Sequence, residues 1–317
     1  MRVENISNVV IVGSGTMGPG IAATFARNGY TTTLSDIDAG QLVKARGTLD
    51  FVFASLLAGG FITEPGVAEA RARLTLAHDA NAAIAEADFV VENVAERVEV
   101  KRTVLQQLCE RARHDAILAS DTSGIPISAL QAGMKNPGRI VGMHWSNPPH
   151  LIPVIEVIKG DQTDASTVGT TVAIVESMAM VAGIVDRDVP GFVENRILYA
   201  IMREALHLLD EGVASAEAID TIVKWGIGYK LAVIGPLALL DVAGLDIYTA
   251  VASYLNKDLC NDAGVSSTIS RKVAEGKLGL KTRGGLFDYA SDEIARLARE
   301  RGRLLMATRK TLQSDGR

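Results

Sequence analysis

The sequence has little cysteine, few aromatic residues and no cluster of positive charge. Its two cysteines, Cys109 and Cys260, are too few for a disulfide framework and lack the spacing of metal ligands, so we expect no bound metal. Lysine and arginine number 32 against 37 aspartates and glutamates, and they form no basic block. This mildly acidic balance argues against a nucleic acid as partner.

Long uninterrupted hydrophobic runs are also absent. The two most apolar stretches are residues 168–185, which contain a glutamate, and residues 231–245, which contain Gly235 and Pro236. Neither is expected to span a membrane. The N-terminus leads into the apolar run 9–12 without the charged flank and cleavage site of a signal peptide. We therefore expect a cytoplasmic protein without a membrane partner.

Hydrophobic residues nevertheless make up 48% of the 317 residues, enough for the cores of two domains. In the first half, short runs rich in valine and isoleucine alternate with alanine-rich stretches of helical period. This alternation predicts an α/β fold with a doubly wound, mostly parallel sheet and helices on both faces. The expected strands are residues 9–12, 31–35, 89–91, 117–120, 140–143 and 154–158.

The pattern changes around Pro190 and Gly191, residue types that commonly break regular structure. We predict a first domain over residues 1–187 and an all-α domain over residues 188–317, in which the last helix, 291–312, packs on the surface or on a second subunit. The other long segments with apolar residues at three- and four-residue spacing are 192–211, 215–225 and 239–255.

Gly13, Gly15 and Gly18 follow the first predicted strand and precede an alanine-rich helix. In this context Gly-x-Gly-x-x-Gly predicts a turn that brings a pyrophosphate to the helix N-terminus. Asp36, after the second predicted strand, is placed to bind ribose hydroxyls, and Asp38 disfavours the extra phosphate of NADP. NAD is the predicted cofactor; the alternative is a glycine turn that only packs a helix on the sheet.

His144 follows a predicted strand, and Glu156 lies within the next one. The carboxyl ends of strands in a doubly wound sheet face the ligand crevice, so His144 is a candidate general base. A glutamate bonded to its far nitrogen would fix the tautomer. The alternative is a structural histidine, because sequence spacing does not show that the two side chains meet.

Seven ordered motifs resemble the L-3-hydroxyacyl-CoA dehydrogenase family from end to end. The resemblance implies a Rossmann-type first domain, a helical second domain that usually makes a homodimer, and hydride transfer between NAD and the carbinol carbon of a small-molecule substrate. The motifs are residues 13–18, 119–123, 142–149, 155–157, 190–196, 235–237 and 284–289.

The resemblance also implies roles by position. His144 would be the general base and Glu156 its orienting partner, while Ser123 and Asn195 would hydrogen-bond the substrate oxygen on which charge develops.

On the cofactor side, the resemblance implies contacts from Thr16 and Met17 in the glycine turn and from Asn147. It further implies that Glu96 and Lys101 contact the nicotinamide ribose. Taken alone, the stretch around Glu96 and Lys101 predicts an exposed helix with ion pairs one turn apart.

The chain departs from the family at the helical excursion after the second strand. Members that use coenzyme A thioesters usually carry a lysine there, whereas residues 48–66 contain neither lysine nor arginine. The motifs instead resemble a branch acting on small carboxylated alcohols and aldehydes, with carnitine and gulonate dehydrogenases and an enzyme of vitamin B6 degradation that oxidises a formyl-hydroxy-methylpyridine carboxylate. In this branch Lys230 would hold a substrate carboxylate, and Trp145 could stack on a flat ring; the alternatives are a solvated lysine and a core tryptophan.

Three hypotheses follow. The first is an NAD-dependent dehydrogenase for a small carboxylated hydroxy or formyl compound. The second is a dehydrogenase of short 3-hydroxyacyl-CoA, because coenzyme A can be bound by backbone and apolar contacts. The third is a crystallin-like protein that binds NAD without turnover, which has no need of a base aimed at the nicotinamide.

Overall fold

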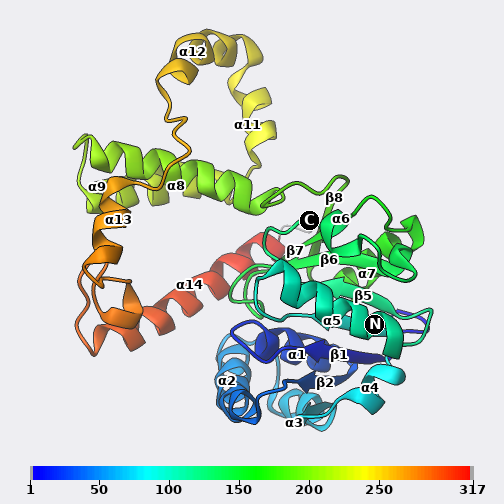
Figure 1. Ribbon diagram of the computed structural model, residues 1–317. Helices are drawn as coiled ribbons and strands as arrows, with labels where there is room; N and C mark the ends of the chain where they lie inside the picture. Colours follow the sequence, from blue (N-terminus) through cyan, green and yellow to red (C-terminus); the bar gives the residue numbers. More distant parts are fainter. Residues whose placement is uncertain (1–2, 315–317) are drawn as a thin grey trace. The chain divides into compact units, whose positions relative to one another are not determined.

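An eight-stranded sheet forms the centre of the first half of the computed structural model, which describes residues 3–314 (Figure 1). Neighbouring strands follow the order β3-β2-β1-β4-β5-β6-β7-β8, and all pairs are parallel except β6 with β7. The predicted α/β fold with a mostly parallel sheet is therefore confirmed. The strands are β1 (Asn8–Val12), β2 (Thr31–Ser35), β3 (Leu74–Ala77), β4 (Phe89–Glu92), β5 (Ile117–Ser120), β6 (Ile140–Trp145), β7 (Val154–Ile158) and β8 (Val181–Val185).

Helices cover both faces of the sheet, and the central strands are continuous apolar runs because both of their faces are buried. In β1, Val9 and Ile11 enter one core and Val10 enters the other. The first core contains side chains of α1 (Gly18–Arg27), α2 (Ala39–Ala58), α3 (Glu64–Ala72) and α7 (Ala165–Ser177). The second contains side chains of α4 (Asn81–Ala85), α5 (Val98–Arg111) and α6 (Ile127–Gln131), and a short 3₁₀ helix, η1 (Pro137–Arg139), precedes β6.

The first of the two compact units ends at Arg196, later than the boundary expected from residues 1–187. The added segment stays with the sheet because Phe192 is fully buried in the second core. In addition, the backbone N–H of Glu194 donates to the Glu156 carboxylate on β7 at 3.1 Å. The proline–glycine break therefore lies a few residues before the end of the first compact unit.

Residues Leu305–Arg309 also belong to the first unit, although they lie in the last helix of the chain. The Arg309 guanidinium is buried, donates to the carbonyl of Ala179 at 3.0 Å and lies 5.1 Å from the centre of the Phe61 ring. One turn of the terminal helix thus packs on the α/β unit.

The second unit, residues 197–304 and 310–314, is helical, as the sequence predicts. Gly244, with a φ of +96°, divides the expected helix over 239–255 in two. The helices are α8 (Glu194–Asp210, which begins in the first unit), α9 (Ala216–Ile222), the π-helix η2 (Val223–Gly228), α10 (Tyr229–Leu231), α11 (Pro236–Ala243), α12 (Leu245–Asp258), α13 (Ser267–Ala274), the 3₁₀ helix η3 (Leu280–Thr282) and α14 (Glu293–Ser314).

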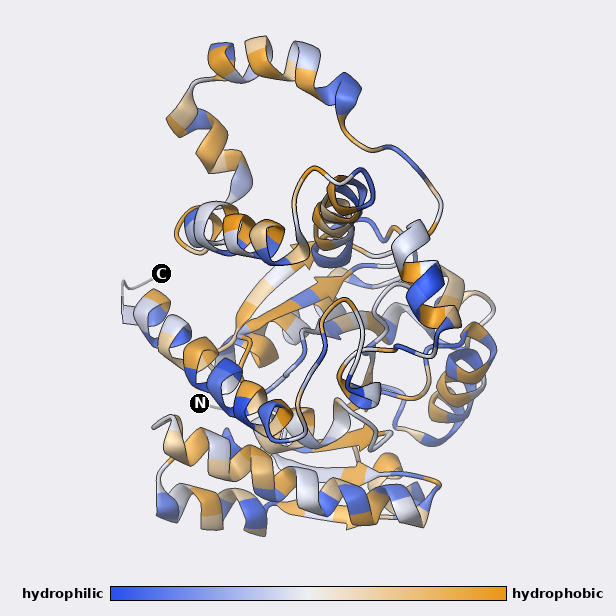
Figure 2. Cartoon of the chain, turned by 90° about the vertical axis from the view of Figure 1, so that its left-hand side faces the viewer, coloured by the Kyte–Doolittle hydropathy of each residue, from blue (hydrophilic) through white to orange (hydrophobic). Residues whose placement is uncertain are grey.

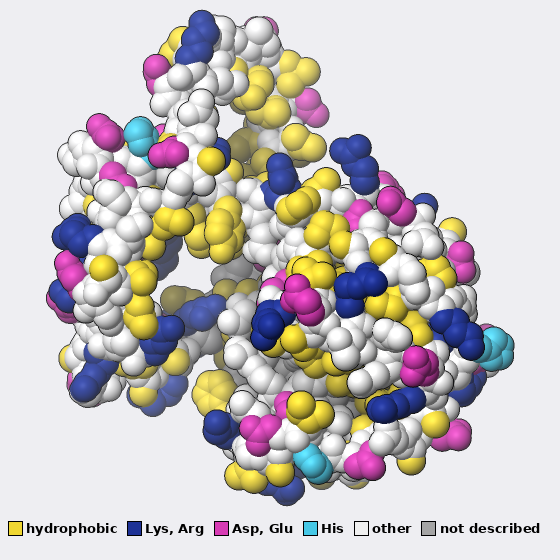
Figure 3. Space-filling view, in the orientation of Figure 1, with side chains coloured by type: hydrophobic (Ala, Val, Ile, Leu, Met, Phe, Trp, Pro, Cys, Tyr) yellow, Lys and Arg dark blue, Asp and Glu magenta, His cyan; other side chains and the backbone are white. Residues whose placement is uncertain are grey.

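This helical unit has almost no core of its own. Between residues 197 and 304, Ile219 is the one buried hydrophobic side chain. Figure 2 shows hydrophobic stretches along its helices, and Figure 3 shows such side chains at the surface over α11 and α8. Within residues 3–314 no single helix is long and apolar enough to cross a membrane; Ala216–Leu231 and Pro236–Ala243 satisfy the criteria of length and composition only together, as a pair bent by 86°.

Candidate active site

The glycine turn between β1 and α1 has the geometry of a pyrophosphate cradle. Gly13 has a φ of +111°, and a Cβ there would lie 2.3 Å from the Asn93 carbonyl oxygen, so this position requires glycine. A Cβ on Gly15 would meet nothing within 4 Å, which leaves open space beside the turn. The N-terminus of α1 has no side-chain cap, so its amides are available to an anion. These features fit a dinucleotide, and Thr16 and Met17 lie in the same turn.

Asp36 closes the turn from the end of β2. One of its carboxylate oxygens accepts hydrogen bonds from the backbone N–H and the hydroxyl of Ser14, at 2.8 and 2.9 Å. Its other oxygen accepts the N–H of Asp38 at 2.9 Å. Burial would raise the pKa of Asp36, but these hydrogen bonds from Asp38 and Ser14 outweigh it and lower the pKa. The carboxylate expected to face the ribose is thus held charged beside the glycine turn.

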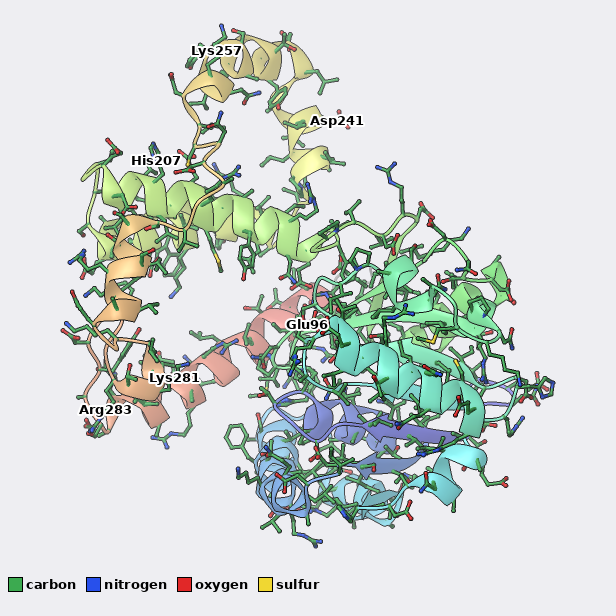
Figure 4. All side chains as sticks on the ribbon, in the orientation of Figure 1. Glu96, His207, Asp241, Lys257, Lys281 and Arg283 are labelled. Carbon is green, nitrogen blue, oxygen red and sulfur yellow. The ribbon has the colours of Figure 1, made fainter. Side chains whose placement is uncertain are left out.

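Glu96, labelled in Figure 4, lies in the loop between β4 and α5. One carboxylate oxygen accepts hydrogen bonds from the Thr122 hydroxyl at 2.7 Å and from the Ser123 backbone N–H at 2.9 Å. Its side chain is 45% exposed. Glu96 therefore joins the loops after β4 and β5 and remains accessible to a ligand.

Lys101 is buried beneath the loop that carries Glu96. Its side chain is 1% exposed, and its ammonium group donates to the fully buried Glu92 carboxylate at 2.9 Å and to the Val94 carbonyl at 3.3 Å. The Glu96 carboxylate is 3.4 Å away. Lys101 is therefore a buried ion-pair partner of Glu92 that also lies beside Glu96, and its contact with the nicotinamide ribose stays a prediction.

Trp145 and Asn147 flank the end of β6 in different environments. Trp145 is 2% exposed, and its ring centre lies 6.0 Å from that of Phe25 in the core. Because it is buried, Trp145 is not available to stack on a substrate ring, and the core alternative is correct. Asn147 is exposed at the following turn, where a cofactor could reach it.

His144 and Glu156 lie opposite each other on the antiparallel strands β6 and β7. The Nδ1 atom of His144 is 2.8 Å from Oε2 of Glu156. The other oxygen of Glu156 accepts the backbone N–H groups of Val193 and Glu194 at 3.0 and 3.1 Å. The glutamate is therefore fixed on both sides, and with Nδ1 protonated, Nε2 of His144 is left as the proton acceptor.

Three carboxylates set the proton affinity of this imidazole. Burial would lower the pKa of His144, but the hydrogen bond to Glu156 and the charges of Asp121, Glu156 and Glu194 raise it. Burial would raise the pKa of Glu156, but the hydrogen bonds from His144 and the backbone lower it. Asp121, which accepts the N–H of Trp145 at 2.9 Å, is so deeply buried that its pKa rises to about 7.

Ser123 and Asn195, to which the resemblance assigns the substrate oxygen, lie in contact. The Asn195 side-chain amide donates to the carbonyl of Ser123 at 2.7 Å. The Ser123 side chain is exposed at the end of β5, whereas Asn195 is half-buried. Both residues belong to the same unit as His144.

Sequence reasoning missed Asp121 and Glu194. The Ser146 hydroxyl lies 2.6 and 2.5 Å from the two carboxylate oxygens of Glu194. One donor atom each of His144, Glu156 and Glu194 lie within 4.8 Å of one another, a spacing that could suit a metal. However, Nδ1 of His144 and both oxygens of Glu156 already form hydrogen bonds. The sequence did contain a signal for both residues. Asp121 lies in the same motif as Ser123, and Glu194 lies in the same motif as Asn195.

Lys230 lies in α10 of the helical unit, and its side chain is exposed. This agrees with an anion anchor and equally with a solvated lysine, so its role stays a prediction.

Two family models match the chain. The 3-hydroxyacyl-CoA dehydrogenase NAD binding domain matches residues 8–189, and the C-terminal domain of the same family matches residues 191–289.

Known proteins resemble the chain over nearly its full length. A 5-formyl-3-hydroxy-2-methylpyridine 4-carboxylate 5-dehydrogenase from Mesorhizobium japonicum is 46% identical, over 97% of this chain and 99% of its own. A crystal structure of an enzyme of that name, described as an NAD⁺-dependent dismutase, has a TM-score of 0.91 and 45% identity, and the match covers 98% of this chain and 99% of the other. A 3-hydroxybutyryl-CoA dehydrogenase from Bradyrhizobium diazoefficiens is 34% identical over 90% of this chain and 96% of its own.

Proposed function

Because the chain belongs to the 3-hydroxyacyl-CoA dehydrogenase family and is an NAD-dependent oxidoreductase, we propose that its substrate is a small carboxylated hydroxy or formyl compound. A formyl-hydroxy-methylpyridine carboxylate is the leading candidate. The observation that carries this choice is the 46% identity, over 97% of the chain, to an enzyme named for that compound.

The second candidate is the oxidation of a short 3-hydroxyacyl-CoA, supported by the relative named for 3-hydroxybutyryl-CoA. The sequence of residues 48–66, from the middle of α2 to the start of α3, argues against a coenzyme A thioester. This segment carries no lysine or arginine that could bind the phosphates of coenzyme A.

His144 acts as the general base in the proposed reaction. Its Nε2 atom accepts the proton of the substrate hydroxyl, which for an aldehyde is the hydroxyl of its hydrate. Glu156 keeps Nδ1 protonated and stabilises the imidazolium that forms. Bound NAD⁺ supplies the hydride acceptor.

Ser123 and Asn195 bind the substrate oxygen as negative charge develops on it. The Ser123 hydroxyl is exposed, and the Asn195 amide uses one hydrogen on the Ser123 carbonyl and keeps a second one. Two neutral donors placed in this way favour the charged oxygen over the neutral one.

The acid limb of the pH profile reports on the state of His144. The raised pKa places this limb of kcat/KM at a higher pH than an unperturbed histidine would, because the imidazole must be neutral to accept a proton and turnover is lost as the pH falls through its pKa. Glu156→Gln removes the largest raising influence, so we expect the limb to move to lower pH while kcat falls. Glu86→Gln, at an exposed site, is the control. An acid limb at the same pH in Glu156→Gln and in the wild type would contradict the pairing of Glu156 with His144.

A substrate panel tests the proposed function. NADH formation with carnitine, gulonate and the formylpyridine carboxylate is compared with the reverse reaction on acetoacetyl-CoA. We expect turnover on the carboxylated compounds and, for Lys230→Ala, a KM for them that is about 10- to 100-fold higher, the value of a charge-assisted hydrogen bond. Lys257→Ala, at another exposed lysine, is the control. Robust activity on the thioester with none on the free acids would overturn the proposal.

We propose that the helical unit forms a homodimer with a second copy of the chain. On α11, Leu237 and Val242 are 78% and 73% exposed, and the unit lacks a core that could stabilise it alone. Light scattering should give twice the chain mass of 33.6 kDa, and Leu237→Glu should shift it towards the monomer. A wild-type monomer at micromolar concentration would contradict this.

We also place the enzyme in the cytoplasm, which cell fractionation tests.

A further inference from the structure

Glu194 is a carboxylate beside the base with hydrogen-bonding capacity to spare. Glu156 is held by the imidazole and by two backbone N–H groups. Glu194 is half-buried, and the Ser146 hydroxyl, which has a single proton, is its side-chain donor. A carboxylate has about four acceptor positions. Within residues 3–314, no lysine or arginine forms an ion pair with Glu194.

The position of this carboxylate restricts what it can bind. Its nearest oxygen lies within 4.8 Å of the ligand atoms of His144 and Glu156. A group held by Glu194 therefore lies close to the imidazole of His144. A metal ion would compete with the existing bonds of His144 and Glu156, whereas a cationic nitrogen can bind Glu194 without breaking either. A substrate carboxylate would be repelled from this side.

Building on the proposed function, we propose that Glu194 is a specificity-determining residue that binds a positively charged nitrogen of the substrate, next to the carbon that gives up the hydride. A protonated ring N–H fits, because the ring nitrogen of a 5-formylpyridine is meta to the formyl group. A quaternary ammonium two bonds from a carbinol carbon, as in carnitine, fits as well. Gulonate and acyl-CoA thioesters carry no such charge near the reacting carbon.

Glu194 also affects the proton affinity of His144, and this effect has to be distinguished from the binding of a substrate cation. Three carboxylates raise the pKa of His144: Glu194, Glu156 on β7, and Asp121 on the loop after β5. Asp121 in turn faces the charges of Lys101 on α5 and of Glu92, which are paired with each other. If Glu194 acted only through the base, its loss would affect every substrate equally. If it binds a cation, its loss discriminates between substrates.

The test is the ratio of KM values in Glu194→Gln, which is isosteric and neutral. We expect KM for the formylpyridine carboxylate to rise about 10- to 100-fold relative to KM for gulonate, the value of a charge-assisted hydrogen bond. KM for carnitine, whose ammonium group has no N–H to donate, should rise relative to gulonate through the lost charge attraction alone. Ser146→Ala should act in the same direction but less strongly, and Glu217→Gln, at an exposed site of α9, should change no ratio. Equal changes for substrates with and without the cationic nitrogen, or a shifted pH profile with unchanged KM ratios, would overturn the proposal.

An inhibition experiment keeps this test independent of the substrate proposal. N-methylpyridinium is a permanent cation, and toluene is its uncharged isostere. With whichever substrate the wild-type enzyme turns over, including the thioester, we expect N-methylpyridinium to compete with substrate and to weaken at least tenfold in Glu194→Gln, whereas inhibition by toluene is unchanged. The same N-methylpyridinium inhibition in both proteins overturns the cation site, whereas lack of turnover on free acids overturns the proposed function alone.

Discussion

His144→Gln should lower kcat by about 10²- to 10⁴-fold, the range for loss of a positioned general base. Glutamine fills a similar volume and can still donate to Glu156, but its amide does not accept a proton at neutral pH. The affinity for NAD should remain, because the groups proposed to bind the pyrophosphate and the ribose, the glycine turn and Asp36, make no contact with this side chain. Single-turnover kinetics and calorimetric titration with NAD measure the two quantities.

Two outcomes would count against this assignment. Unaltered turnover would mean that another group takes the proton, and Asp121, with a pKa near 7, would be the next candidate. Loss of NAD binding together with turnover would mean that the substitution disturbs the fold, which circular dichroism detects. A substitution at Phe192 is a control for such a disturbance of the fold, because the Phe192 ring contacts His144 and is fully buried. Phe192→Leu should lower stability with a much smaller effect on kcat.

The sequence predicted the central strands well because burial on both faces makes them continuous apolar runs. Among the central strands, β5 begins and ends at the predicted residues. The bounds of β2 and β7 are also as predicted. In β2 the reason is its β-branched threonines, because its sequence Thr-Thr-Thr-Leu-Ser is not an apolar run. β3 and β8 were not predicted, since they lie at the two edges of the sheet and are less buried. In β8, Val181 and Ile184 are more than half exposed, so its pattern differs little from that of the helix before it.

The proposed catalytic pair, His144 and Glu156, illustrates what the sequence alone could not supply. Twelve residues separate His144 from Glu156, a spacing that fixes no contact. They meet because β7 reverses direction and pairs antiparallel with β6, which places the two residues opposite each other. Asp121 and Glu194 come from two further segments, so their charges act on the imidazole only once the sheet is assembled.

Lys101 is the clearest case in which tertiary structure overrides the local pattern. Its helix predicts an exposed lysine, yet the ammonium group is buried on the Glu92 carboxylate at the end of β4. Lys101→Met should therefore cost about 3–5 kcal/mol of unfolding free energy, because it leaves a buried carboxylate without its cation. Urea unfolding measures this loss. Lys44→Met, at an exposed site of α2, should stay within about 0.5 kcal/mol of wild type.

The double variant Glu92→Gln/Lys101→Met separates the structural role of Lys101 from a cofactor contact. With both charges gone, no ion is left buried, and the amide oxygen introduced at position 92 can still accept the hydroxyl proton of Ser120, which Glu92 accepts at 2.6 Å. Much of the lost stability should return, because replacing a buried ion pair as a whole is far less costly than removing one partner. A ribose contact predicts the opposite: unchanged stability in Lys101→Met, with a raised Kd for NAD that the second substitution does not restore. Because Glu96 is 3.4 Å from the same ammonium, a structural role still allows a small rise in Kd, which the double variant should share.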